Sequence, residues 1–329
     1  MATPGLVPPD AWDTHIHIFD PESFPYGTPR SYTPKKALLN EYPFETTTCA
    51  NLVVVQATVQ GHSAEPLLAT LDGNGKPDQC THIRGICTVD PTTISDGELD
   101  ALHAAGVRGV RMHEMSWGHG TQSGIQAISD KIRAAAARVA RLCWVIDVFT
   151  DVYTWAAMAP MIRNDVDPRV KLIADHMGGA FPGDEKLEDF GVFLGLIRDG
   201  LLYVKLSGFE RLYHGHSSGM QTLESALKSV VAAGPERILY GSGMSLIDHP
   251  RMSSRCLVHC MSLNEPILDW PHTQLGVSRK GKTDQQRLNE VEDFRHVEDR
   301  LHIETLRNWI AEESTWTRLW CDNPRRLFE

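Results

Sequence analysis

Eight short apolar segments recur along the chain, and helix-like stretches separate them. The apolar segments occupy residues 11–19, 51–58, 82–89, 107–112, 143–149, 170–176, 201–208 and 237–242. The stretches between them have helical periodicity, as in residues 95–105, which end at Gly106, a natural C-terminal cap. This alternation predicts a (β/α)₈ (TIM) barrel. A doubly wound sheet would instead need a Gly-rich phosphate loop after the first strand, where this chain has Phe19-Asp20-Pro21.

Length and charge narrow the class of protein. The 329 residues suffice for one large barrel, and no linker or repeat divides them, so we expect a single domain over residues 1–329. The net charge of -10, without a basic run, argues against a nucleic-acid or anionic-membrane surface. The seven cysteines lack metal-binding spacing and are expected to be reduced. With no signal peptide and no apolar run long enough to span a bilayer, we expect a cytoplasmic protein.

The first apolar segment carries two histidines, His15 and His17, two residues apart. Simple strand alternation would point one set of side chains to one side, namely Trp12, Thr14, Ile16 and Ile18, and the other set to the opposite side, namely Asp13, His15, His17 and Phe19. Both imidazoles then project into the same space. A divalent metal or an anionic or carbonyl-bearing ligand would satisfy their nitrogens there, and ordinary hydrogen bonding is the alternative.

Polar side chains gather at the carboxyl ends of the predicted strands, where barrel enzymes place their catalytic groups. These strand-end residues are His15, His17, Gln56, Thr58, Arg108, Arg111, His113, Asp147, Asp175, His176, Lys205 and Ser207. Histidines and arginines at so many strand ends are hard to explain as core filler. The pattern therefore predicts one site at this end of the barrel, in which Lys205 is expected to pair with Asp147.

Five motifs together resemble one branch of the amidohydrolase superfamily, which contains 2-pyrone-4,6-dicarboxylate hydrolase and related lactonases. They are Asp13-Thr14-His15-Ile16-His17, Gly106-Val-Arg108-Gly-Val-Arg111, Ala174-Asp175-His176-Met177-Gly178-Gly179, Val204-Lys205-Leu206-Ser207-Gly208 and the closing Asp322-Asn323-Pro324 with Arg326-Leu327. The resemblance covers nearly the whole chain. It implies an amidohydrolase-like barrel that hydrolyses a small cyclic ester.

The resemblance also implies roles for single residues. The carbonyl of a lactone must be polarised, a water deprotonated and the developing oxyanion stabilised. The residues expected to polarise the carbonyl are His15, His17 and His176, with Asp269 of strand eight as the base for water. The residues expected to bind a substrate carboxylate or the rest of the substrate are Arg108, Arg111, Arg211, Gln56, Thr58 and Ser207. Arg108 is the arginine for which a purely structural role is the main alternative, and for Arg211 the alternative is an ordinary ion pair.

Metal dependence stays open at this point. In the wider superfamily a metal sits on the equivalents of His15, His17, His176 and Asp269, so a single Zn²⁺ or Mn²⁺ is one alternative. The pyrone-dicarboxylate enzymes are implied to work without a metal, which is the other. A binuclear site is not expected, because Met112 and Asp147 stand near the places of the bridging lysine or glutamate.

The motif of strand eight is interrupted in this chain. Relatives of this branch have a contiguous Gly-Ser-Asp-Trp-Pro-His stretch, whereas here Gly241-Ser242 and Asp269-Trp270-Pro271-His272 are separated by residues 243–268. This atypical insertion shows neither helical nor strand periodicity. We interpret it as an in-frame retained intron, against the alternative of a family-specific loop. A further alternative is that Asp248 has taken over the role of the base, although Asp269 has the better local match.

Three functions follow from these observations. The first is hydrolysis of a small, anionic lactone or related cyclic ester. The second is metal-dependent, non-oxidative decarboxylation of an aromatic or muconate-type acid, which related barrels perform. The third is a catalytically impaired barrel, because the strand-eight motif is interrupted. In all three the partner is a small molecule and neither a nucleic acid nor a membrane, and the oligomeric state is open, with a homo-oligomer among the alternatives.

Overall fold

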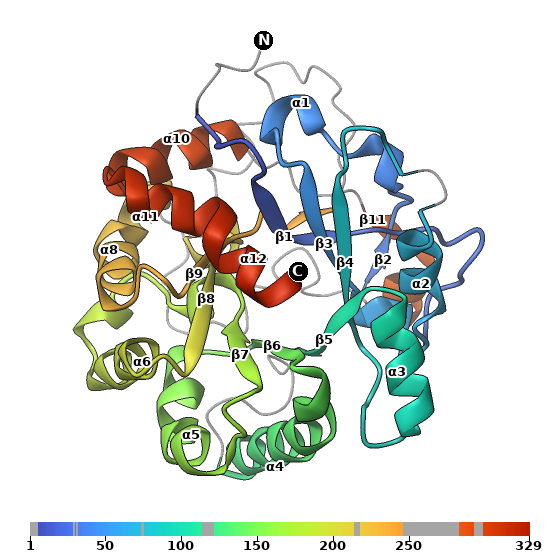
Figure 1. Cartoon of the computed structure of the whole chain (residues 1–329), viewed down its shortest axis with the longest axis horizontal. Coiled ribbons are helices and arrows are strands. Elements are labelled where there is room, and N and C mark those ends of the chain that lie inside the picture. Colours follow the sequence, from blue (N-terminus) through green and yellow to red (C-terminus); the bar gives the residue numbers. More distant parts are fainter. Residues whose placement is uncertain are drawn as a thin grey trace.

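A ring of parallel strands forms the centre of the molecule in the computed structural model (Figure 1). The structure describes residues 6–28, 30, 32–73, 76–113, 122–213, 218–245, 283–292 and 299–329. Neighbouring strands follow the order β10-β1-β3-β4-β5-β6-β7-β8-β9. Their bounds are β1 Trp12–His17, β3 Asn51–Val55, β4 His82–Cys87, β5 Val107–His113, β6 Val145–Phe149, β7 Lys171–Ala174, β8 Leu202–Leu206, β9 Ile238–Tyr240 and β10 Met244–Ser245. The predicted (β/α)₈ barrel is therefore confirmed.

The ring closes between its first and last strands. The Thr14 hydroxyl donates to the carbonyl of Tyr240 at 2.6 Å, and the amide of Gly243 donates to the carbonyl of His15 at 3.0 Å. The short strand β10 continues the line of β9 along β1, in register Ile16–Met244 and His17–Ser245. The insertion 243–268 was expected to lack strand character, and this is wrong for its first residues, because a two-residue strand is too short to show a period. Its remaining residues, 246–268, lie outside the described part.

Helices surround the ring in chain order (Figure 1). The longer ones are α2 Glu65–Leu71, α3 Asp96–Ala104, α4 Gln122–Val139, α5 Val152–Asp165, α6 Glu188–Arg198, α8 Glu224–Ala233 and α10 Asp299–Trp309. The shorter ones are α1 Phe44–Thr47, α7 Phe209–Leu212, α9 Asp284–Asn289, α11 Glu313–Thr317 and α12 Asn323–Phe328, and β2 Thr33–Pro34 pairs with β11 Val291–Glu292 outside the ring. Ser95 caps α3 and Gly106 follows it at φ +101°, as the pattern predicts. None of the described helices is long and apolar enough to cross a bilayer.

Apolar side chains pack in two layers, one on each face of the strands. Residues such as Leu52, Val54 and Val148 pack outward against the helices. The alternate residues fill the amino half of the barrel interior, namely Trp12, Val53, Val55, Ile86, Val145, Ile173, Tyr203, Leu239 and Phe328. This interior packing supports the amino end of the ring and leaves the carboxyl end to polar residues.

A bulge in β1 corrects the simple alternation expected for residues 12–19. Asp13 pairs with Leu52 of β3, but Ile16 pairs with Val54. β1 therefore advances by three residues while β3 advances by two, which is a β-bulge. The extra residue reverses the facing, and Trp12 therefore lies on the same interior side as His15 and His17. Strict alternation placed Trp12 on the opposite side from the histidines and Asp13 on the same side, and both assignments are wrong. Because of the bulge, one strand supplies both Trp12 to the packed interior and His15 and His17 to the polar end.

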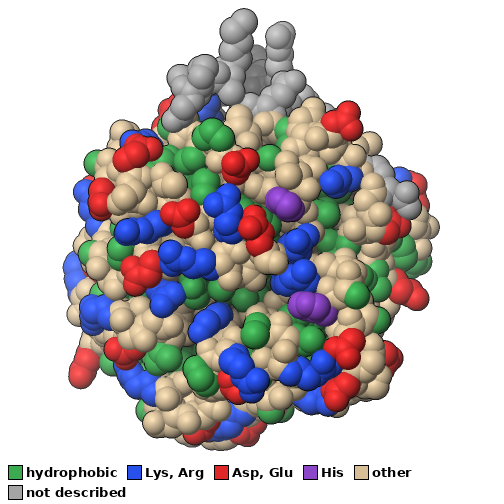
Figure 2. Space-filling view, in the orientation of Figure 1, with side chains coloured by type: hydrophobic (Ala, Val, Ile, Leu, Met, Phe, Trp, Pro, Cys, Tyr) green, Lys and Arg blue, Asp and Glu red, His purple; other side chains and the backbone are tan. Residues whose placement is uncertain are grey.

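The C-terminal helix α12 lies across the middle of the ring at the amino ends of the strands (Figure 1). Phe328 stacks 6.1 Å from Trp12, and Nε of Arg84 donates to the Phe328 carbonyl at 2.9 Å. Figure 2 shows basic and acidic side chains interleaved on this face. On α12 itself, Arg325 pairs with Glu329. The amino end of the barrel is therefore closed by the chain's own terminus.

Candidate active site

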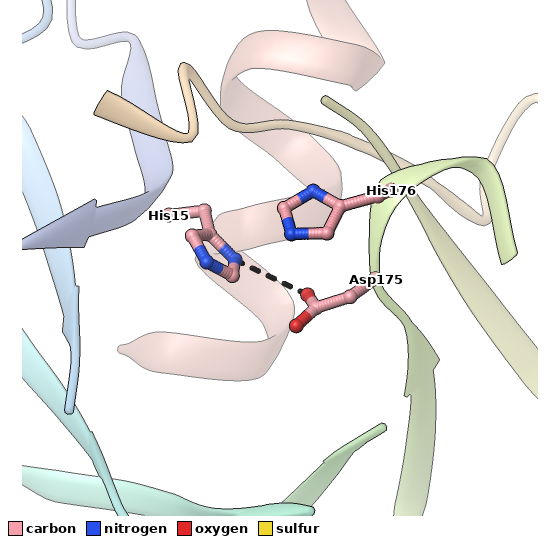
Figure 3. A group of neighbouring side chains, drawn as sticks. All are labelled: His15, Asp175 and His176. Carbon is pink, nitrogen blue, oxygen red and sulfur yellow. Dashed lines mark hydrogen bonds and ion pairs between the residues drawn. The ribbon is translucent and has the colours of Figure 1, made fainter. Parts of the chain in front are cut away.

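The carboxyl end of the ring collects buried polar side chains from five strands. β1 supplies His15 and His17, β5 supplies Arg111 and β6 supplies Asp147, while Asp175 and His176 follow β7 and Lys205 is on β8. All seven side chains are at least nine-tenths buried. Figure 3 shows His15 reaching from β1 toward Asp175 and His176, which stand on the turn after β7. Parallel strands that end at one edge bring together residues far apart in the sequence.

The ring of His15 contacts the rings of the other two histidines. The ring centroid of His15 lies 4.9 Å from that of His17 and 4.8 Å from that of His176. Phe149 of β6 packs edge-on against His176 at 4.9 Å and closes that side. The structure thus brings together the three histidines that were predicted from the sequence.

One nitrogen of each histidine is fixed by a neighbour. Nδ1 of His17 donates to the Val55 carbonyl at 2.6 Å, and Nδ1 of His176 lies 2.9 Å from the Ser207 hydroxyl. Nδ1 of His15 lies 3.2 Å from both Asp175 Oδ1 and Lys205 Nζ. The Nε2 atoms of His15 and His176 are buried and have no hydrogen-bond partner among the described residues. Such orphaned atoms are costly unless a ligand completes them.

Burial keeps the three imidazoles neutral. It lowers the pKa of His15 to about 3, although Asp175 opposes the shift. Burial also holds the pKa of His176 and that of His17 well below the usual range, helped by the charge of Arg211 at His176 and by His15 at His17. At neutral pH each ring therefore has one N–H and one lone pair to offer.

A left-handed turn presents His176 to the site. His176 and Met177 have φ of 49° and 58°, and Gly178 and Gly179 continue at 66° and 68°. Residues with a Cβ adopt this conformation at a cost of about 1–2 kcal/mol each, so the two glycines relieve half of the strain. They also allow close packing, because a Cβ on Gly178 would lie 2.4 Å from Phe193 and one on Gly179 2.3 Å from the Thr150 carbonyl. The motif His-Met-Gly-Gly is therefore a structural requirement of the turn.

Behind His15 the buried charges form a continuous chain. Lys205 Nζ lies 2.6 Å from Asp147 Oδ2 and 3.0 Å from Asp175 Oδ1, which confirms the expected pairing with Asp147. Arg111 Nε lies 3.8 Å from Asp175 Oδ2. Burial and then the neighbouring Asp175 raise the pKa of Asp147 to about 8. Burial alone would raise the pKa of Asp175 too, but Lys205 and His15 outweigh it and hold that pKa well below its usual range.

The three predicted arginines have separate positions. Arg111 is inside the barrel, where its Nη1 donates to the Gln56 carbonyl at 3.3 Å. Arg211 is on α7 beside Glu210, close enough to His176 to affect its pKa. Arg108 is bonded to the carbonyls of His103 and Val107 near the amino end of β5, so the structure places it away from the site. Arg108 is the second residue of β5 and Arg111 lies nearer its carboxyl end, which is why the two do not line one pocket.

Of the other predicted substrate-binding residues, one lies in the site and two lie outside it. Ser207 is bonded to His176 and belongs to the cluster. The amide of Gln56 donates to the Ser63 carbonyl at 2.7 Å and accepts from the Thr88 amide at 3.1 Å, so it ties two loops together. Thr58 is exposed at the start of a short 3₁₀ turn, Thr58–Gln60. The two predicted candidates for the base, Asp269 and Asp248, lie outside the described residues.

Asp13 is a buried residue whose part in the site was not predicted. Its Oδ1 accepts from the amides of His15 at 3.1 Å and Ser242 at 3.0 Å, and its Oδ2 accepts from the Tyr42 hydroxyl at 3.0 Å. Asp13 thus joins the start of the His-x-His segment to the residues that follow β9, the eighth strand of the barrel. The only sequence signal was its place next to the histidines, and the bulge that turns it away from the pocket leaves no trace in the pattern.

Comparisons with known proteins agree with this geometry. The amidohydrolase family model (Amidohydro_2) matches residues 12–329. The chain belongs to the amidohydrolase family. A 2-pyrone-4,6-dicarboxylate hydrolase of Comamonas testosteroni is 28% identical over 254 residues, 72% of this chain and 77% of the relative. A 4-sulfomuconolactone hydrolase of Hydrogenophaga intermedia is 23% identical over 331 residues, 98% of this chain and 90% of the relative.

Solved structures share the fold of this amidohydrolase. A probable 2-pyrone-4,6-dicarboxylic acid hydrolase of Acinetobacter baumannii, with citric acid bound, superposes with a TM-score of 0.66 at 19% identity, covering 97% of this chain and 99% of that one. More distant structures of the same fold include a Burkholderia multivorans amidohydrolase with bound zinc, at a TM-score of 0.58 and 15% identity, and a Rhizobium 2,6-dihydroxybenzoate decarboxylase, at 0.54 and 12%. At these identities the likeness concerns the fold alone.

The donor atoms of this amidohydrolase fit a metal ion only in part. Ligand atoms of His15, Asp175 and His176 all lie within 4.8 Å of one another, close enough to share one ion. His17, which the sequence proposed as a ligand, does not join this group, and Asp175 is already bound by Lys205 and Arg111. A zinc site needs three or four protein ligands and gains nothing from adjacent cations. The described residues therefore suit a metal in donor type and in number, but the cations beside Asp175 oppose one.

Proposed function

We propose that this amidohydrolase opens a small lactone that carries a carboxylate. The observation that carries the proposal is the convergence of three neutral imidazoles with Arg111 and Lys205 at the carboxyl end of the barrel. Relatives named as hydrolases of a pyrone dicarboxylate and of a sulfomuconolactone support an anionic cyclic ester as the substrate. Both of those substrates carry acidic groups, which suits the guanidinium groups of Arg111 and Arg211.

Hydrolysis of a lactone requires only a few functional groups. A water oxygen attacks the lactone carbonyl while a base takes its proton, and the resulting oxyanion is stabilised by N–H groups and cations already in place. The ring C–O bond then breaks, and the leaving oxygen takes the proton that the base removed from water. In this proposal His176 and His15 polarise the carbonyl, Arg111 and Arg211 hold the carboxylate, and Asp269 is the base. No metal enters any of these steps.

A panel of lactones tests this function. We expect the purified protein to hydrolyse 2-pyrone-4,6-dicarboxylate or 4-sulfomuconolactone well above an uncharged lactone of similar size. His176→Asn should lower kcat by a factor of about 10²–10⁴, the usual share of a group that assists proton transfer or polarisation. The matched control is His103→Asn, because His103 bonds Trp144 away from the site. Release of CO₂ from an aromatic or muconate-type acid, without lactone opening, would instead identify a decarboxylase.

Metal dependence is measured on the same preparation. We expect less than stoichiometric Zn²⁺ and Mn²⁺ by elemental analysis and unchanged turnover after dialysis against a chelator. Loss of activity on chelation, with recovery on adding either metal, would contradict the metal-free route.

A catalytically impaired barrel is the second candidate, and the backbone at Gly243 favours it. Gly243 directly follows Ser242, where the resemblance expects the aspartate that comes after the eighth strand of the barrel, here β9. A Cβ at this position would lie 3.9 Å from Cε1 of His176 and 3.6 Å from the Gly208 amide nitrogen. A side chain here would therefore point at the histidines, and glycine has none. Joining Ser242 to Asp269 would give Asp269 the register of Gly243, at a φ of +67° that aspartate tolerates.

Deleting residues 243–268 tests this candidate. If the insertion impairs the enzyme, we expect the shortened chain to hydrolyse the lactone panel at least about 100-fold faster, and Asp269→Asn within it to abolish the gain. A spliced transcript that joins the codons of Ser242 and Asp269 would support a retained intron. Equal turnover in both chains would contradict impairment. Comparing Asp248→Asn with Asp269→Asn in the full chain then shows which carboxylate is the base.

A further inference from the structure

The two histidines of β1 face different partners at Nδ1. Nδ1 of His17 lies 2.6 Å from the Val55 carbonyl, which can only accept, so this nitrogen carries the proton and Nε2 carries a lone pair. Nδ1 of His15 lies 3.2 Å from the Lys205 ammonium, which can only donate, and 3.2 Å from the Asp175 carboxylate, which accepts. The tautomer of His15 therefore depends on which of these two neighbours it serves.

We propose that Lys205 is a positioning residue that holds the proton of His15 on Nε2, so that His15 offers the substrate an N–H while His17 offers a lone pair. The ammonium of Lys205 has three N–H groups. The structure surrounds it with three acceptors, Asp147 Oδ2 at 2.6 Å, Asp175 Oδ1 at 3.0 Å and His15 Nδ1 at 3.2 Å. Donation to all three satisfies the buried ammonium completely.

The opposite tautomer satisfies fewer groups. A proton on Nδ1 of His15 would bond Asp175 but would face the Lys205 ammonium, and one N–H of that ammonium would lose its acceptor. Lys205 has no exposed surface, so water cannot replace the lost bond. An unmade hydrogen bond at a buried charged group costs more than one at a neutral group. Asp175 loses little in the proposed tautomer, because Lys205 already donates to it and Arg111 stands 3.8 Å from its other oxygen.

The assignment gives the pair complementary roles. The Nε2 atom of His15 is buried and has no partner in the part of the chain that the structure describes, so its proton is free to bond a substrate oxygen. That is the group a lactone carbonyl needs as negative charge develops on it. The lone pair on Nε2 of His17 can accept a hydrogen bond from a water molecule. The step rests on the proposed hydrolysis, but the tautomer itself does not.

Nitrogen NMR of the histidine side chains tests the tautomer without any substrate. Protonated and bare ring nitrogens have well separated ¹⁵N shifts, and His15→Gln and His17→Gln assign the signals in ¹⁵N-histidine protein. We expect the proton on Nε2 in His15 and on Nδ1 in His17. A proton on Nδ1 of His15 in the unaltered protein would overturn the proposal, whether or not the protein hydrolyses lactones.

A double variant tests the cause. Lys205→Met with Asp147→Asn removes the ammonium together with its nearest carboxyl partner, so that neither is left buried without the other, and circular dichroism checks the fold. We expect the His15 proton to move to Nδ1, toward Asp175, and kcat to fall about 100-fold with little change in KM. Lys171→Met is the matched control, since Lys171 is on β7 but bonds the Pro168 carbonyl at the surface. An unchanged His15 tautomer in the double variant would contradict the role of Lys205.

Discussion

Two arginines of one strand show that the position of a residue along a strand determines whether its side chain reaches the site. Arg108 and Arg111 are three residues apart on β5, and the register of β5 against β4 shifts between Val107 and Gly109. Arg108 bonds backbone carbonyls near the amino end, whereas Arg111 reaches the Gln56 carbonyl and Asp175 inside the barrel. Both had been expected to bind a substrate carboxylate. Their positions along the strand, which the sequence does contain, would have separated them, because Arg108 is at the amino end of β5 and catalytic groups lie at the carboxyl ends.

Replacing each of these arginines by lysine gives a matched pair. Arg111→Lys keeps the charge next to Asp175 but loses the planar fork that binds a carboxylate at two points. We expect KM for an anionic lactone to rise about 10- to 100-fold, which corresponds to roughly 1.5–3 kcal/mol for bonds to a charged group. Arg108→Lys should leave KM within about twofold, because it removes no contact with the site. Equal effects of the two changes in steady-state kinetics would contradict the assignment.

At the scale of elements, the turn after β7 positions the side chain of His176. Four consecutive left-handed residues, from His176 to Gly179, aim the imidazole at His15. The two glycines make this turn possible, because Phe193 and the Thr150 carbonyl occupy the space that side chains would need. A turn of this kind is stable only where its surroundings hold it, as conformations of this type do in functional sites.

Alanine in this turn should therefore cost both stability and turnover. For Gly179→Ala we expect a loss of roughly 2–5 kcal/mol in the free energy of unfolding, from left-handed strain and overpacking together, and a large fall in kcat as His176 moves. Gly183→Ala is the control, since Gly183 has φ +103° but nothing within 4 Å of its Cβ position. It should lose only about 1–2 kcal/mol and keep its activity. Urea unfolding and kinetics of both variants measure the difference, and similar losses would contradict the packing argument.

At the scale of the whole molecule, the buried charges make stability depend on pH in two opposite directions. His15, His17 and His176 have a lower pKa in the folded chain than when unfolded, so the unfolded chain binds more protons below about pH 6.5. Folding stability therefore falls as the pH drops below that value. Asp147 and Asp299 have a pKa raised to about 8, through burial first and nearby carboxylates second. Here the folded chain binds more protons, so stability falls as the pH rises from about 4 to 8.

The two trends together predict a stability maximum near pH 6.5. Below it the three histidines outweigh the two carboxyls, and above it the carboxyls act alone. We expect the urea midpoint to decrease from about pH 6.5 to 8, and Asp299→Asn to remove part of that decrease. Asp299 is at the start of α10, outside the histidine cluster, and it opposes the histidines below pH 6.5, so its replacement should also make the loss of stability on the acid side steeper. A midpoint that rises steadily up to pH 8 would contradict the raised pKa of both carboxyls.

The sequence by itself determined the architecture and most of the cluster. Eight apolar segments alternating with helical ones specify the barrel, because each period matches one element and its burial. Parallel strands that end at one edge then require His15, His17, Arg111, Asp175, His176, Lys205 and Ser207 to share that edge. These arguments use only local periodicity and the rule that chemistry gathers at the carboxyl ends.

Tertiary structure alone decided how those residues face one another. The bulge in β1 puts Trp12 on the side of His15, the left-handed turn aims His176, and three acceptors around Lys205 select a tautomer. Each of these depends on contacts between residues far apart in the chain, such as Lys205 with Asp147 and Gly179 with Thr150. A linear pattern records which side chains an element carries and their period. It does not record the close packing between elements, which sets register, backbone strain and the position of single protons.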